Sequence, residues 1–149
     1  MIGQIYRSTA MKTLLVPLLA VASLTACATN RMSDTDRLAM YQASAGEPVK
    51  QIRFYNAMGW DRVDDQHVVL NMRPRESWLV KVSGPCLDWG SGSPTLQLST
   101  TGPYVTPKLD RILTNGSPVS CRIEEIRPIN VAALRAAQDS ATAQAPSGT

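Results

Sequence analysis

The chain has 149 residues, which is enough for one small domain and too few for two. Its formal charge is +3, but without Arg7 and Lys12 thirteen basic residues face twelve acidic ones, a side-chain charge of +1. No cluster of lysine and arginine remains that would predict a nucleic-acid-binding face, so we expect no nucleic-acid partner.

The N-terminal segment, residues 1–26, is typical of a secretory signal peptide. Lys12 supplies a positive charge, and an apolar run over residues 14–24 follows it. This run is shorter than the roughly 20 apolar residues that a membrane-spanning helix needs. Met11 gives a more compact signal than Met1 and is a candidate for the true start.

Leu24-Thr25-Ala26-Cys27 resembles the lipobox of bacterial lipoproteins. The resemblance implies cleavage before Cys27, a diacylglycerol on its thiol and an acylated amino terminus. Each buried acyl CH₂ contributes about 0.8 kcal/mol, so several chains anchor a protein without a transmembrane helix. In lipoproteins of this kind Ala28, in place of Asp, favours the outer membrane. We therefore expect a lipid anchor to the outer membrane, facing the periplasm; the alternative is an ordinary cleaved signal with a nearby free cysteine.

The chain contains three cysteines, an odd number that needs an explanation in an exported protein. If the lipid occupies Cys27, then Cys86 and Cys121 form an even pair in an oxidising compartment, which predicts a disulfide between them. Closing a loop of this length stabilises a domain by up to roughly 3–4 kcal/mol. A reduced pair, a metal site or a redox couple is the alternative, although the chain has no Cys-x-x-Cys motif.

Composition divides the mature chain into three parts. Residues 27–47 are polar after the lipidated cysteine and predict a flexible tether, with one helical turn around 36–43. Residues 48–130 carry the strand signals and form the expected domain. Residues 131–138 favour a short helix, which Pro128 and Asn130 introduce, and the small polar residues of 138–149 predict a disordered tail.

Alternation of apolar and polar residues predicts the strands of this domain. Val68, Leu70 and Met72 lie on one face of an expected strand, and a turn over 73–76 joins this strand to the next in a β-hairpin. The last strand changes parity, which predicts a bulge near Glu124-Glu125. The expected strands cover 49–55, 67–72, 77–82, 95–99, 109–114 and 119–126. We therefore expect a mainly β fold, a small antiparallel barrel or two-layer sheet of five to six short strands, with one disulfide and a short C-terminal helix.

Several short motifs resemble an uncharacterised family of small proteobacterial envelope proteins, often lipoproteins, whose domain has no known function. The motifs are Ile52-Arg53-Phe54 leading to Trp60, Trp78-Leu79-Val80, Cys86-Leu87-Asp88, Lys108-Leu109-Asp110-Arg111-Ile112, and Cys121-Arg122-Ile123 followed by Ile126-Arg127-Pro128. The resemblance covers residues 50–129. It implies an envelope location and a compact disulfide-bonded domain, and it implies no activity, so no catalytic residue follows from it.

His67 is the one histidine of the chain, and it lies close to Asp64 and Asp65. A Ser-His-Asp arrangement can be drawn from these residues, but there is no Gly-x-Ser-x-Gly motif to expose a nucleophile. We expect His67 to lie exposed at the start of a strand, with no catalytic role.

The sequence predicts no metal site and no cofactor. Asp61, Asp64 and Asp65 lack the spacing of a calcium-binding loop, so a solvated turn is expected. One histidine and two cysteines that are expected to be paired provide too few ligands for a zinc site. The glycine-rich segment 90–93 lacks the lysine of a phosphate-binding loop.

Three tryptophans stand out in a chain that is poor in aromatic residues. Parity places Trp78 in the core. Trp60 and Trp89 flank turns, where they either cap a small core or line a binding surface.

We expect a non-enzymatic structural or interaction module of the bacterial envelope. Its partners would be the membrane, through the lipid anchor, and an envelope protein. The alternative is a periplasmic module that binds or inhibits a ligand or protein.

Overall fold

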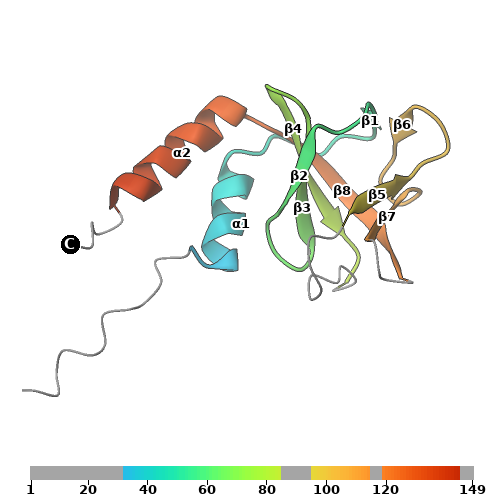
Figure 1. Ribbon diagram of the computed structural model, residues 1–149, viewed down its shortest axis with the longest axis horizontal. Coiled ribbons are helices and arrows are strands. Elements are labelled where there is room, and N and C mark those ends of the chain that lie inside the picture. The colour runs from blue at the N-terminus through green and yellow to red at the C-terminus, as the bar shows by residue number, and fades with distance from the viewer. Residues whose placement is uncertain (1–31, 85–94, 115–118, 145–149) are drawn as a thin grey trace, which may run out of the picture. The chain divides into compact units, whose positions relative to one another are not determined.

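The computed structural model describes residues 32–84, 95–114 and 119–144, and all of them belong to one compact unit of the chain. This part contains two helices and eight strands, and both helices lie on the same side of the larger sheet (Figure 1). The elements are α1 (Asp34–Ala43), β1 (Ile52–Arg53), β2 (Gly59–Arg62), β3 (His67–Arg73), β4 (Glu76–Val82), β5 (Leu96–Ser99), β6 (Tyr104–Val105), β7 (Arg111–Thr114), β8 (Ser120–Ile129) and α2 (Val131–Gln144).

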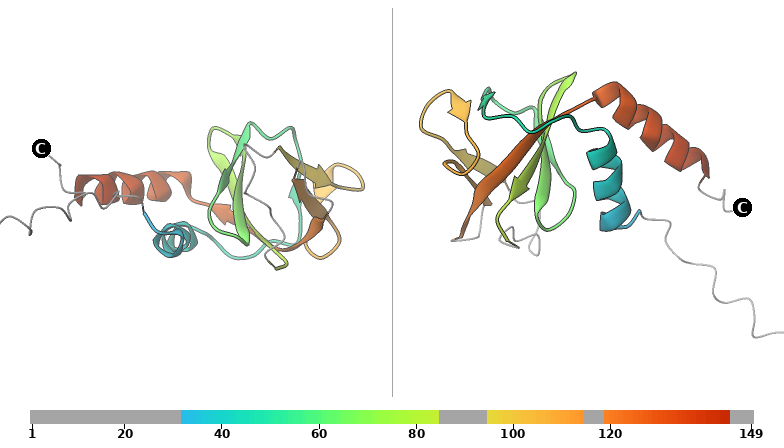
Figure 2. Two further views of the ribbon diagram at one scale, coloured as in Figure 1. Left: turned by 60° about the horizontal axis from the view of Figure 1, so that its bottom comes forward. Right: turned by 180° about the vertical axis from the view of Figure 1, so that it is seen from behind.

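The fold is mainly β, as the sequence predicts. Six strands form an antiparallel sheet in the order β2-β3-β4-β8-β7-β5, and β1 pairs with β6 in a second sheet of two strands. The larger sheet curls into a half-barrel, whose strands surround a common interior (Figure 2). Its two outermost strands in the described residues are β2 and β5.

The predicted hairpin is confirmed. Leu70 pairs with Trp78, and Arg73 pairs with Glu76, which leaves Pro74 and Arg75 as the turn. The predicted bulge is confirmed as well, because the pairing of β4 with β8 shifts by one residue at Glu124. The shift keeps Ile123 and Ile126 on the same face of β8, and both are fully buried.

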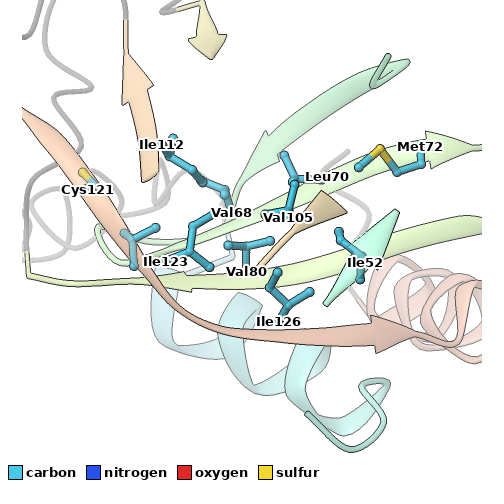
Figure 3. Packing of buried hydrophobic residues seen from close by; sticks show 11 residues of the cluster. Ile52, Val68, Leu70, Met72, Val80, Val105, Ile112, Cys121, Ile123 and Ile126 are labelled. Carbon is cyan, nitrogen blue, oxygen red and sulfur yellow. The ribbon is translucent and has the colours of Figure 1, made fainter. Parts of the chain in front are cut away.

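The interior of the half-barrel is the main core. Its buried side chains come from β3, β4, β7 and β8 and from the small sheet, so strands far apart in sequence share one interior (Figure 3). The buried members are Ile52, Val68, Leu70, Met72, Val80, Val82, Val105, Ile112, Cys121, Ile123 and Ile126. Trp78, expected in the core, is half-buried and packs against this cluster.

The opposite face of the sheet carries a second core beneath α1 and α2. Tyr41 of α1 and Leu134 of α2 pack with Val69 and Leu79, which point away from the barrel interior. Ser33 caps α1, because its side-chain oxygen accepts a hydrogen bond from the backbone N–H of Asp36. Asn130 caps α2 in the same way through the N–H of Ala133.

Both helices are longer than the sequence predicts. Residues 34–43 form a full helix packed on the sheet, where we expected a tether with one helical turn. The C-terminal helix begins at Val131 as expected and extends to Gln144, six residues beyond the predicted end. In α1, apolar residues at helical spacing, such as Leu38 and Tyr41, pack on a surface that the sequence alone does not reveal.

Strand lengths also differ from the prediction. The strand expected over 49–55 is reduced to Ile52–Arg53. Strands β2 and β6 were not expected, because Gly59-Trp60-Asp61-Arg62 has a weak alternation and Tyr104–Val105 is only two residues long, in a segment bounded by Pro103 and Pro107. Both depend on pairing with a partner strand rather than on local pattern.

Candidate functional site

A cavity of about 340 Å³ lies between β2 and β5 and is here called the seam cavity. The nine described residues that line it come from the segment after β1, from β2 and β3, and from β5 and the residue before it. They are Phe54, Asn56, Ala57, Gly59, Trp60, Leu70, Thr95, Leu96 and Leu98.

The walls of the seam cavity continue the interior of the half-barrel. Trp60 pairs with Leu70 across β2 and β3, and Leu70 is fully buried. Leu96 and Leu98 alternate toward the interior, as the sequence predicts, but they are only half-buried. In the part of the chain that the structure describes, the core is therefore incompletely covered here, and large apolar side chains border the cavity.

The chemistry of the seam cavity suits an apolar group. Its volume is at the lower end of the roughly 300–1,000 Å³ that small-molecule sites occupy, and such sites are lined mostly by apolar and aromatic side chains. Asn56 and Thr95 are the polar side chains among its described lining residues. Trp60, one of the two predicted binding-surface residues, therefore lies in this wall and also packs against the core; Trp89 lies outside the described residues.

A second cavity, of about 490 Å³, lies on the opposite face of the sheet and is here called the outer groove. Residues of α1, β3, β4 and β8 and the residue before β3 line it. They are Gln42, Gln66, His67, Leu79, Lys81, Glu125 and Arg127. His67 pairs with Lys81, and Lys81 pairs with Glu125, so these three side chains form a row across three strands.

His67 is buried, which corrects the expectation that it lies exposed at a strand start. Only 8% of the residue is accessible. Its Nδ1 lies 2.9 Å from both carboxylate oxygens of Asp64, so Nδ1 carries the proton and donates to the carboxylate. Asp64 also accepts a hydrogen bond of 2.7 Å from the N–H of Gln66, which fixes its side chain in the turn before β3.

Glu125 and Arg127 form an ion pair at the far side of the outer groove, with 2.6 Å between Arg127 Nε and Glu125 Oε1. This hydrogen bond, together with the charges of Arg127, Lys81 and His67, lowers the pKa of Glu125. Because the pKa is lowered in the folded state, the pair stabilises the fold above the ordinary carboxyl pKa and loses this effect as the pH falls through the lowered value. The pair is partly exposed, so the effect is about 1 kcal/mol or less.

The three aspartates of the predicted solvated turn have separate partners. Asp61 accepts from Asn71 Nδ2 at 2.8 Å, Asp65 pairs with Arg62 at 2.8 Å, and Asp64 holds His67. Within the described ranges, no group of three or more potential metal ligands is gathered.

The cysteines are placed only in part. Cys121 is on β8, 1% exposed, and pairs with Ile112 across the two strands. Cys27 and Cys86 lie outside the described residues, as does the glycine-rich segment 90–93. The lipid attachment and the disulfide stay predictions.

The outer groove was not found from the sequence. Its charged residues are separated by up to 60 positions, and only strand register brings His67, Lys81 and Glu125 into one row. The sequence signal for the groove was weak. Each of these residues lies on the polar face of a strand whose opposite face is apolar, which is common in half-buried sheets.

The fold and the two cavities define a small, mainly β domain with an apolar site on one face of the sheet and a polar site on the other. Residues 10–145 match DUF6491, described as a family of unknown function, and the chain belongs to this family. The expected resemblance to an uncharacterised family is thus confirmed at that level. No curated protein and no solved structure matches the chain. Among the helices described, none is long and apolar enough to cross a membrane.

Proposed function

We propose that this protein is a lipoprotein of the bacterial envelope whose domain is a non-enzymatic binding module. The observation that carries the binding function is the seam cavity, where Phe54, Trp60, Leu96 and Leu98 stay half-buried around an open space. An occupant that covers these side chains would gain about 25 cal/mol for each Å² of apolar surface that it buries.

The occupant of the seam cavity is an apolar group. In the first form of the proposal, a partner protein of the envelope inserts an apolar side chain there, as tight interfaces often do at a central pocket. The alternative, a small apolar ligand, is favoured by the concave shape of the site and by its volume of about 340 Å³. Crosslinking in intact envelopes captures the first kind of occupant, and mass spectrometry of the purified protein under native conditions detects the second.

The proposed cellular location is based on the sequence. The lipobox-like Leu24–Cys27 supports lipid attachment at Cys27, and Ala28 supports transfer to the outer membrane, with the domain in the periplasm. The expected partners are accordingly the membrane, through the anchor, and an envelope protein.

Substitution Cys27→Ser tests the lipid anchor. Without the thiol no diacylglycerol can be attached, and we expect the protein to leave the membrane fraction and to lose labelling by radioactive fatty acid. Ser23→Ala, in the same segment, is the matched control and should leave both properties unchanged. A Cys27→Ser protein that stayed membrane-bound and labelled would overturn the anchor.

The Cys86–Cys121 disulfide is part of the proposal. Its support is the oxidising compartment, the even pair that remains after lipidation, and the buried position of Cys121. We expect titration of the unfolded mature protein with a thiol reagent to find no free thiol before reduction and two after it. Detection of two free thiols before reduction would exclude the bond.

Substitution Leu98→Arg tests the seam cavity. A guanidinium in an apolar site must be desolvated, so we expect the fluorescent apolar probe N-phenyl-1-naphthylamine to bind at least about tenfold more weakly, a change of about 1.4 kcal/mol or more. Leu109→Arg is the matched control, because Leu109 is 77% exposed and lies outside the cavity. Equal probe affinity in both variants and the wild type would contradict the assignment of the site.

A further inference from the structure

The outer groove contains a histidine with one ring nitrogen held and the other open. The side chain of His67 is 90% buried, and its Nδ1 is bound to Asp64. Its Nε2 has no hydrogen-bond partner among the described residues, yet it is not sealed from solvent. Because the rest of the ring is buried, we infer that Nε2 is accessible from the outer groove, which His67 lines.

Two cations line the outer groove together with His67. Lys81 is the cross-strand neighbour of His67, is exposed, and has no ion pair with a described residue. Arg127 uses its Nε on Glu125, which leaves the two terminal nitrogens of the guanidinium for other acceptors. The amides of Gln42 and Gln66 complete the polar wall.

We propose that the outer groove binds a phosphate group. The phosphate oxygens would accept hydrogen bonds from Lys81 and Arg127, the two side chains best suited to this chemistry. The hydroxyl of a free phosphate can also donate to His67 Nε2, whereas the oxygens of a phosphodiester, which has no hydroxyl, can only accept from a protonated ring. Asp64 is a positioning residue, because it fixes the ring through Nδ1.

The charges of the groove set the kind of phosphate. Lys81 and Arg127 are positive and Glu125 is negative, and the carboxylates of Asp64 and Glu47 act on His67 and Arg127, so the surroundings oppose a high negative charge. Glu125 also orients Arg127 through their 2.6 Å hydrogen bond. A singly charged phosphate, free or within a phosphodiester headgroup, fits this balance.

The phosphate site is independent of the seam cavity. The side chains of His67, Lys81 and Glu125 point to the helix-covered face of the sheet, whereas the seam cavity opens from the barrel interior. No described residue lines both sites. If the experiment on one site fails, the proposal for the other site is therefore unaffected.

His67 provides a direct test because it is the one histidine in the chain. In the ¹⁵N-labelled full-length protein, its ring gives a single set of imidazole NMR signals. We expect sodium phosphate, added at constant ionic strength and fixed pH, to shift the Nε2 signal to saturation, and sodium chloride to leave it unchanged. In Lys81→Gln and Arg127→Gln the dissociation constant should rise at least about tenfold.

Arg75→Gln is the matched control, since Arg75 lies in the turn at the far end of the β3–β4 hairpin. It should bind phosphate like the wild type. Soluble dihexanoyl phosphatidylglycerol, compared with inorganic phosphate, identifies the source: tighter binding of the lipid indicates a headgroup, and tighter binding of the inorganic ion indicates free phosphate. A Nε2 signal that does not move to saturation with either compound, or that moves equally in the Lys81→Gln/Arg127→Gln double variant, would overturn the site.

Discussion

Substitution Leu70→Ala is expected to lower the free energy of unfolding by about 2–5 kcal/mol, as large-to-small changes in close-packed cores do. Leu70 is fully buried in the barrel interior, between Val68 and Met72 on β3. The cost combines the lost transfer energy of the side chain with the cavity that remains. Urea denaturation of the full-length protein, followed by far-ultraviolet circular dichroism, measures the change.

Leu109→Ala is the matched control for this prediction. It removes the same atoms from a side chain that is 77% exposed, so the unfolding free energy should change by no more than about 0.5 kcal/mol. If the two variants were equally stable, the half-barrel interior would not be the core of this domain.

Substitution Leu79→Ala tests the second core, beneath the helices. Leu79 is 4% exposed on the opposite face of the sheet and packs with Tyr41, Val69 and Ile129. We expect a loss of about 2–3 kcal/mol, the lower part of the range for buried leucines, because Leu79 also borders the outer groove. The same urea titration reports it, with tyrosine and tryptophan fluorescence as a second probe.

Lys81→Ala provides the comparison on the same strand and the same face. Its side chain is exposed, so its truncation should cost no more than about 0.5 kcal/mol. A Leu79→Ala protein as stable as Lys81→Ala would mean that α1 does not cover the sheet and that residues 34–43 behave as the tether that the sequence suggests.

Period-two alternation predicts the barrel interior well. Val68, Leu70 and Met72 on β3 and Val80 and Val82 on β4 share one face, as expected, because an antiparallel strand repeats every two residues. The weaker elements escape this signal. β2 holds one large apolar residue, Trp60, among polar neighbours, and its position follows from pairing with β3.

The second core could not be read from the pattern because its parts are single positions in separate elements. Val69 on β3 and Leu79 on β4 are each a single apolar residue on a strand face that is otherwise polar. Tyr41 belongs to a polar segment that reads as a linker until the sheet offers it a surface. Helix formation in such a segment depends on tertiary packing more than on propensity.

The bulge at Glu124 illustrates how one backbone irregularity defines a site. Strict alternation from the buried Ile123 would place Glu125 in the barrel interior. The extra residue turns Glu125 to the other face, opposite Lys81, and so completes the row that begins at His67. The parity change in the sequence predicts the bulge, but the row appears only when three strands are in register.

The seam cavity shows the same limit. Trp60 can be recognised as a candidate binding residue from composition alone, whereas Leu96 and Leu98 look like ordinary interior residues of a strand. The curl of the sheet brings β2 and β5 to either side of one space, although β3, β4, β8 and β7 separate them in the strand order.

The binding role of the seam cavity is tested most directly by backbone ¹H–¹⁵N NMR spectra of the full-length protein, titrated with octyl glucoside below its micelle concentration. The uncharged headgroup has no phosphate, so the outer groove should not respond. We expect saturable shifts that are concentrated at Phe54, Trp60, Leu96 and Leu98, the apolar wall of the cavity. Shifts confined to the exposed Met58 and Leu109, or shifts that never saturate, would contradict the proposal that this domain binds an apolar group at its seam.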